Sequence, residues 1–194
     1  MSDSRFDEAV ARFAAINAED PHRELVAGVE QPRELVQAER LVRWVARLAP
    51  DASEALRLAA HCQHLGRFRV PRASYPEGRI GYLKWRTELA RRHAETASSV
   101  LEELGYPAET RERVRRIVQK QQLTLDPEVQ TMEDALCLSF LEHEFGDFAA
   151  KHDDDKLVDI LQKTWRKMSP RARELALALP LSGRALALIE RALG

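Results

Sequence analysis

Five ionisable side chains stand inside the apolar stripes of predicted helices, where an unpaired charge would be costly to bury. They are contributed by four different helices and are Glu39, His61, His64, His93 and Asp134. His61 and His64 are three residues apart, so a helix would place them on one face. Helical bundles assemble metal sites from such inward-pointing residues, and mixed imidazole and carboxylate ligands suit Fe, Mn, Zn, Ni or Co. We therefore predict that these five residues hold a divalent metal. The alternative is that each is a buried polar group satisfied by its neighbours.

A basic segment follows the two-histidine helix. Residues 67–79 contain two prolines and four arginines and are predicted to form a long loop, and long loops in compact domains are often functional. The basic side chains in and just after it include Arg69, Arg72, Arg79, Lys84 and Arg86. Arginines beside a metal could hold a phosphate by paired hydrogen bonds, and we expect Arg72 and Lys84 to face one cleft with His64. An ordinary basic surface is the alternative.

The elements that must position these residues are helices. Apolar residues recur at helical spacing through most of the chain, and Pro and Gly separate the segments. An all-α fold of eight or nine helices in one domain, 1–194, is predicted. Asp51 or Ser53 is expected to cap the third helix, and the only short β-like stretch is 68–70. The helices are expected near 6–18, 32–49, 53–65, 80–104, 108–121, 127–148, 154–167, 170–179 and 182–192.

Composition narrows the class of protein. The chain has 194 residues, 44% of them hydrophobic, and a net charge of −1. This excludes a highly charged disordered chain, and no apolar run approaches the ~20 residues of a membrane span. The N-terminus does not look like a secretory signal. Cys62 and Cys137 lie in apolar helical patterns, which predicts buried, reduced thiols in a cytoplasmic protein.

Charge is unevenly distributed along the chain. Residues 67–120 contain 13 Lys and Arg against 7 Asp and Glu, whereas residues 126–155 contain 1 Lys against 10 Asp and Glu. Two interpretations stay open at this point. The two regions are solvated faces that partly neutralise each other, or an acidic wall that attracts metal faces a basic wall that attracts anions.

Parts of this pattern resemble the HD metal-dependent phosphohydrolase superfamily over about residues 35–140. Residues 58–66 look like its apolar helix that ends in a His-Asp pair and a glycine, although Gln63-His64 stands here in place of His-Asp. Glu39 falls where the first ligand histidine is expected. Residues 93–97 resemble its later histidine, and Glu133-Asp134 the helix that brings the last aspartate. The resemblance implies an HD-domain-like helical bundle.

A closer resemblance covers most of the chain. The strings at residues 70–76, 81–86, 140–143 and 155–165 look like those of the domain-of-unknown-function 4202 family. That family carries no assigned reaction, so the resemblance supports a fold without naming a substrate.

The leading hypothesis is a metal-dependent hydrolase of the HD-like class that acts on a small phosphorylated molecule or nucleotide. The metal would lower the pKa of a bound water, and Glu133 and Lys84 would serve catalysis. The arginines expected to hold the substrate are Arg69, Arg72, Arg79 and Arg86. Two alternatives remain: a diiron oxygenase, and a degenerate HD-like module that binds a ligand or partner without catalysis. No membrane partner is expected, and no nucleic acid either, because no recognition motif appears.

Overall fold

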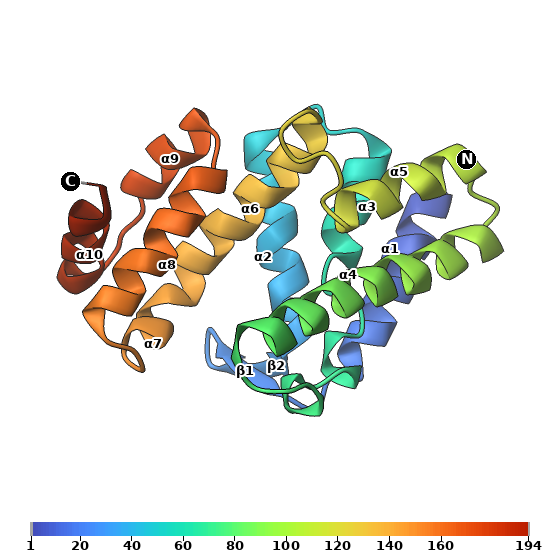
Figure 1. Cartoon of the computed structure of the whole chain (residues 1–194). Coiled ribbons are helices and arrows are strands. Elements are labelled where there is room, and N and C mark those ends of the chain that lie inside the picture. The colour runs from blue at the N-terminus through green and yellow to red at the C-terminus, as the bar shows by residue number, and fades with distance from the viewer. Residues whose placement is uncertain (1, 194) are drawn as a thin grey trace. The chain divides into compact units, whose positions relative to one another are not determined.

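The computed structural model describes residues 2–193, and helices make up most of this part of the chain (Figure 1). The all-α prediction is confirmed, with one short hairpin added. The described chain forms two compact units, one that ends at Gln122 and one that begins at Leu123. Between residues 2 and 193, no helix has the length and the apolar character needed to cross a bilayer.

The described residues of unit 1 form five α-helices, a two-stranded hairpin and two single turns of 3-10 helix. Its elements in chain order are α1 (Ser2–Ala18), β1 (Arg23–Val26), β2 (Val29–Pro32), α2 (Arg33–Leu48), α3 (Glu54–Cys62), η1 (Arg67–Arg69), η2 (Arg72–Ser74), α4 (Gly78–Glu103) and α5 (Ala108–Val118). Helix α3 packs against α1, α2 and α5, and α4 packs against α5. The largest buried side chains of the unit include Phe13, Leu41, Leu58 and Ile117.

The hairpin between α1 and α2 was not predicted from the sequence. Its antiparallel strands pair Val26 with Val29 across a two-residue turn, and both turn residues have positive φ, +50° at Ala27 and +83° at Gly28. Two successive positive φ angles define the type I′ turn of tight hairpins, for which Asn-Gly is the usual signal. Ala-Gly lacks that signal, because alanine seldom adopts the left-handed region.

The buried carboxylate of Asp20 anchors the hairpin to α2. Its Oδ1 accepts hydrogen bonds from the backbone N–H of His22 at 3.0 Å and from the ring Nδ1 of the same residue at 2.8 Å. Its Oδ2 accepts one from the backbone N–H of Glu34, in the first turn of α2, at 3.1 Å. Asp20 therefore caps a helix that begins 13 positions later, and it satisfies an N–H that the helix cannot bond internally.

The predicted loop at 67–79 is an ordered segment held against α4. The indole Nε1 of Trp85 donates to the Val70 carbonyl at 2.8 Å, and Val70 packs with Trp85 and Leu89. A Cβ at Gly81 would lie 1.8 Å from the backbone oxygen of Pro76. Only a residue without a side chain allows the loop to pass so close to the first turn of α4.

Unit 2 is helical throughout, with α6 packed against α7, α8 and α9, and α10 packed against α7 and α8. Its helices are α6 (Pro127–His143), α7 (Phe145–Ala149), α8 (Asp154–Lys167), α9 (Pro170–Leu177) and α10 (Gly183–Leu193). The single helix expected at 127–148 is therefore two, separated at Glu144. Asp153 caps α8 by accepting the Lys156 N–H at 2.9 Å.

Local signals predicted several other features correctly. Ser53 caps α3 by accepting the Leu56 N–H at 3.1 Å. Both cysteines are buried and unbridged, as expected. The stretch at 68–70 is not a strand, because it lies in and just after the 3-10 turn η1.

Candidate functional site

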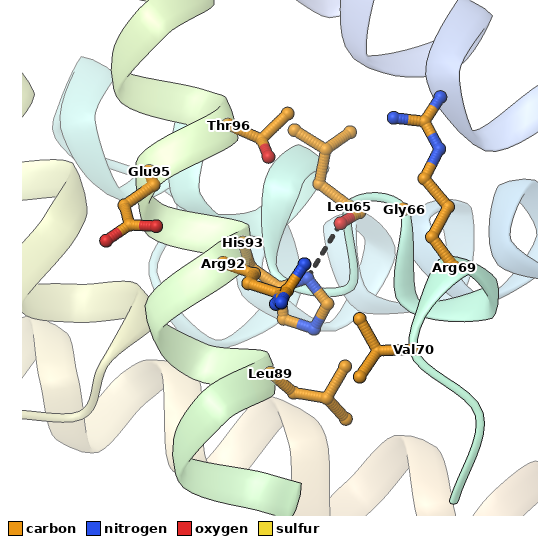
Figure 2. A pocket seen from close by; sticks show the side chains of 9 residues that line it. All are labelled: Leu65, Gly66, Arg69, Val70, Leu89, Arg92, His93, Glu95 and Thr96. Carbon is orange, nitrogen blue, oxygen red and sulfur yellow. Dashed lines mark hydrogen bonds between the residues drawn. The ribbon is translucent and has the colours of Figure 1, made fainter. Parts of the chain in front are cut away.

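A pocket of about 220 Å³ opens in unit 1 between the middle of α4 and the segment that follows α3 (Figure 2). Leu65, Val70 and Leu89 contribute apolar side chains to it. The residues that line it are Leu65, Gly66, Arg69, Val70, Leu89, Arg92, His93, Glu95 and Thr96. One imidazole, two guanidinium groups, one carboxylate and one hydroxyl therefore line a small, partly apolar hollow.

His93 is the buried polar residue of this pocket, with 4% of its surface exposed. Its ring Nδ1 lies 2.7 Å from the carbonyl oxygen of Leu65, and Figure 2 shows this bond. Burial lowers the pKa of His93 to about 4; the Leu65 bond opposes this shift and Arg67 adds to it. The imidazole is therefore neutral at pH 7.

Two arginines of the pocket keep unused hydrogen-bond donors. Arg69 Nη2 pairs with Glu19 Oε2 at 2.6 Å, and Arg92 Nε pairs with Glu88 Oε1 at 2.7 Å. Among the described residues, no hydrogen bond engages the terminal nitrogens of Arg92 or Nη1 of Arg69. Figure 2 shows Arg69 on the loop side of the pocket and Arg92 on the α4 side. Both guanidinium groups therefore retain donors for an anion.

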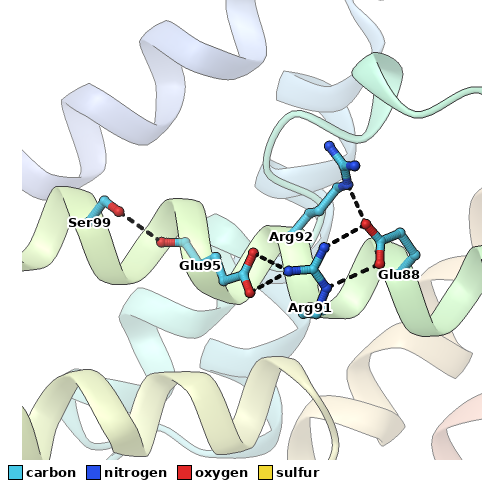
Figure 3. Close-up of polar contacts among 5 residues, drawn as sticks. All are labelled: Glu88, Arg91, Arg92, Glu95 and Ser99. Atoms are coloured by element: carbon cyan, nitrogen blue, oxygen red, sulfur yellow. Dashed lines mark hydrogen bonds and ion pairs between the residues drawn. The ribbon is translucent and has the colours of Figure 1, made fainter.

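The acidic groups nearest the pocket are already paired along α4 (Figure 3). Arg91 Nη1 donates to both oxygens of Glu95, at 2.6 and 2.7 Å, while its Nη2 and Nε donate to Glu88. Hydrogen bonds from Arg91 and then Arg92 lower the pKa of Glu88 to about 2. With the Arg69–Glu19 pair, three arginines face three carboxylates around the pocket, so the charges there balance.

His64 lies beside His93 but outside the lining of the pocket. The two ring centroids are 6.4 Å apart in an edge-on arrangement. Burial and then the positive charge of Arg67 hold the pKa of His64 well below its usual value. Its neighbour Gln63 donates to the Val118 carbonyl at 3.2 Å, which joins the end of α3 to the end of α5. Unit 1 therefore brings two neutral imidazoles together, one of them lining the pocket.

The rings of His61 and His64 contact different side chains. Helix α3 ends at Cys62, and Gly66 then turns the chain with a φ of +66°. The His61 ring packs edge-on against Phe6 of α1, with centroids 6.0 Å apart. Burial lowers the pKa of His61 to about 4.

Glu39 is exposed, so the expectation that it faces the core is wrong. The buried stripe of α2 contains Gln37, Leu41 and Trp44. The sequence offered Leu35, Glu39 and Val42 as an alternative stripe with the same spacing, and tertiary packing selected the other.

Asp134 is buried, as predicted, and Glu133 beside it is buried too, but both belong to unit 2. Asp134 Oδ1 accepts the backbone N–H of Ser169 at 2.8 Å and the side-chain Nε2 of Gln130 at 3.0 Å. Glu133 Oε1 lies 3.5 Å from Lys167 Nζ. These contacts show Asp134 holding the junction between α8 and α9.

The donors available do not fit a metal ion. Within residues 2–193, no three His, Cys, Asp or Glu side chains form a group that could bind one. Of the five expected ligands, Glu39 is exposed, His61 contacts Phe6 and Asp134 is hydrogen-bonded within unit 2. The divalent metal stays a prediction from the sequence.

Of the predicted basic residues, Arg69 alone lines the His93 pocket. Arg72 donates to the carbonyl oxygens of Tyr75 at 2.9 Å and Gly78 at 3.4 Å, which stabilises the loop. Arg79 is exposed and Arg86 lies over the Tyr82 ring. Lys84 lines a separate open hollow with Tyr75. Among the described residues, Lys84 lines a hollow that Arg72 does not line, and neither lines the pocket beside His64, so the single cleft expected for these three residues is not found.

Sequence reasoning missed Arg92 and Thr96, which line the pocket from the same helix as His93. A signal for them existed. Leu89 and Thr96 stand four residues before and three after His93, and side chains at these spacings share one face of a helix. Arg92 lies beside them on the next row.

The chain matches the sequence profile of a family described as a domain of unknown function, DUF4202, over residues 7–189. It belongs to the DUF4202 family. The match spans both compact units. Neither the curated proteins nor the solved structures contain a match to this chain. The comparisons therefore support the closer of the two resemblances and give no evidence for a relationship to the HD superfamily.

Proposed function

We propose that unit 1 binds a small phosphorylated molecule in the His93 pocket. The observation that carries this proposal is a buried neutral imidazole between two arginines that retain free donors. Arginine forms charge-assisted, often bidentate, hydrogen bonds with phosphate, and these are the strong class of hydrogen bond. The pocket is smaller than the about 300–1,000 Å³ typical of drug-sized ligands, which favours a small molecule.

Hydrolysis of that molecule is the reaction predicted from the sequence. The described residues offer no group of three donors that fits a metal ion. Neither Glu133 nor Lys84, the residues predicted to be catalytic, lines the pocket. The geometry of the pocket therefore supports binding of the phosphorylated molecule, and an activity assay decides whether the protein hydrolyses it. Binding without turnover would instead favour the ligand-binding module.

The binding experiment is calorimetric titration of the full chain with inorganic phosphate and with glycerol 3-phosphate. Arg92→Gln should weaken binding by about tenfold or more, because a hydrogen bond to a charged group contributes about 1.5–3 kcal/mol. Arg184→Gln is the matched control, since Arg184 is also exposed and pairs with one carboxylate, Asp154, at 2.8 Å. No binding, or equal weakening by both variants, would refute the proposal.

Phosphate release from glycerol 3-phosphate and p-nitrophenyl phosphate tests the hydrolytic prediction. The protein would be purified without added metal, analysed for bound elements, and assayed with a chelator and with added Mn²⁺, Fe²⁺ or Zn²⁺. Metal-dependent release would support the hydrolase. If the protein binds phosphate but releases none under any condition, the hydrolytic prediction is wrong.

A further inference from the structure

The hydrogen on the His93 ring is placed by the fold. Leu65 offers a carbonyl oxygen, which can only accept a hydrogen bond, so the Nδ1 that lies 2.7 Å away must carry the hydrogen. The direction of that carbonyl is set by the next residue, Gly66, which has a φ of +66°. Gly66 is held in turn by its backbone N–H, which donates to the buried Asn17 Oδ1 at 3.1 Å.

The second ring nitrogen of His93 therefore has a lone pair to offer. Because burial keeps the imidazole neutral at pH 7, a ring with hydrogen on Nδ1 has none on Nε2. The described residues form no hydrogen bond with Nε2. Nε2 is also not fully buried, because it is absent from the fully buried polar atoms that lack a partner. In Figure 2, Nε2 points away from the Leu65 carbonyl, toward the part of the pocket near Val70 and Leu89.

Because Nε2 of His93 can only accept a hydrogen bond, it favours a ligand atom that can donate one. A fully ionised phosphoryl group has only acceptor oxygens, so it is repelled by the Nε2 lone pair and attracted to Arg92 and Arg69. The ligand atom next to Nε2 must carry a hydrogen that it can donate. The apolar side chains of Val70 and Leu89 suit the short carbon skeleton between these two ends.

We infer that the ligand is a hydroxylated phosphate ester, a small polyol or sugar phosphate, whose hydroxyl donates to Nε2 of His93 while its phosphate is held by Arg92 and Arg69. This inference rests on the proposed function, because it specifies the ligand of the same pocket. A hydroxyl that finds its partner should improve binding, and an analogue that lacks it leaves the imidazole unpaired in a buried site.

The test compares two monoesters that present the same phosphate. Glycerol 3-phosphate carries two hydroxyls, and propyl phosphate has the same three-carbon chain without them. Calorimetry at pH 7.5 should show the wild-type protein binding glycerol 3-phosphate about tenfold more tightly. His93→Phe should remove this preference, whereas His152→Phe, a matched change in unit 2, should retain it.

A second measurement does not depend on the variant folding. Long-range ¹H–¹⁵N NMR of the wild-type protein identifies which ring nitrogen of His93 carries the hydrogen. Hydrogen on Nδ1 at pH 7.5 supports the inference, and hydrogen on Nε2 or on both nitrogens overturns it.

The failures can be told apart. If both esters bind equally well, the inference is wrong and the proposed function stands. If a folded His93→Phe variant still binds glycerol 3-phosphate more tightly than propyl phosphate, another group binds the hydroxyl and the inference is again wrong. If neither ester nor inorganic phosphate binds, the proposed function fails, and the ligand class falls with it.

Discussion

Acid should destabilise unit 1 through His93. The pKa of this imidazole is about 4 in the folded protein, against an ordinary value of 6.5. The unfolded chain therefore binds more protons than the folded chain between these two values, and stability falls as pH is lowered through the window. Stability is fully present above about pH 6.5. The loss in the free energy of unfolding that His93 causes reaches about 2 kcal/mol at pH 5, because each unit of pKa shift corresponds to about 1.4 kcal/mol.

The assay is urea unfolding at pH 8 and pH 5, followed by tryptophan fluorescence. Trp44 and Trp85 lie in unit 1 and Trp165 in unit 2, so a Trp165→Phe background restricts the signal to unit 1. His93→Gln removes the titrating group. We expect the loss of stability between pH 8 and pH 5 to be about 2 kcal/mol smaller in this variant. His61 and His64 have pKa shifts of the same direction, so the variant should retain a smaller pH dependence.

The comparison is between pH dependences, so any change that the substitution makes at pH 8 cancels. His152→Gln controls for the loss of a histidine elsewhere in the chain and should leave the pH dependence of unit 1 unchanged. If wild type and His93→Gln lose the same stability within about 0.5 kcal/mol, the burial of a neutral His93 is refuted as a source of acid sensitivity.

Two further predictions concern the elements that hold the pocket and the hairpin in place. Gly81→Ala should lower the free energy of unfolding by about 1–3 kcal/mol in urea titrations, because its Cβ would lie 1.8 Å from the Pro76 oxygen. The control Gly183→Ala adds a Cβ into open space and should leave the free energy of unfolding unchanged. Equal losses of stability in the two variants would contradict the close approach of Pro76 to Gly81. Asp20→Ala should lower the free energy of unfolding by about 1–3 kcal/mol, because it leaves the Glu34 N–H without its acceptor. Amide hydrogen exchange at Glu34 should become faster. Unchanged exchange at Glu34 would show that Asp20 does not cap α2.

The helices were predictable because their signals are local. Ser53 and Asp153 cap helices by bonding N–H groups three residues ahead, and this pattern can be read from neighbouring letters. The hairpin escaped because its turn uses Ala27 at positive φ, a conformation that the surrounding fold imposes. The capping role of Asp20 was not predicted, because its hydrogen-bond partner in α2 is 14 residues away in the sequence.

The candidate site was only partly predictable, and the reason is geometric. The sequence identified His64 and His93 as buried polar residues, and the structure brings their rings to 6.4 Å. It could not show that the His61 ring packs against Phe6 while the His64 ring packs against His93. It could not choose between the two possible stripes of α2, and Glu39 proved to be exposed.

The sequence by itself determined that this protein is helical, where most of its helices begin and end, and that three of its six histidines lie in residues 61–93. Those properties arise from backbone propensity, capping and apolar periodicity, which act over one or two turns. Only the tertiary structure decided which polar groups share a space. The Leu65 carbonyl sets the hydrogen of His93 because Gly66 and Asn17 hold the turn between α3 and η1 in place. Contacts between residues 28 and 49 positions apart carry no local signal, since they form only when separate helices pack together.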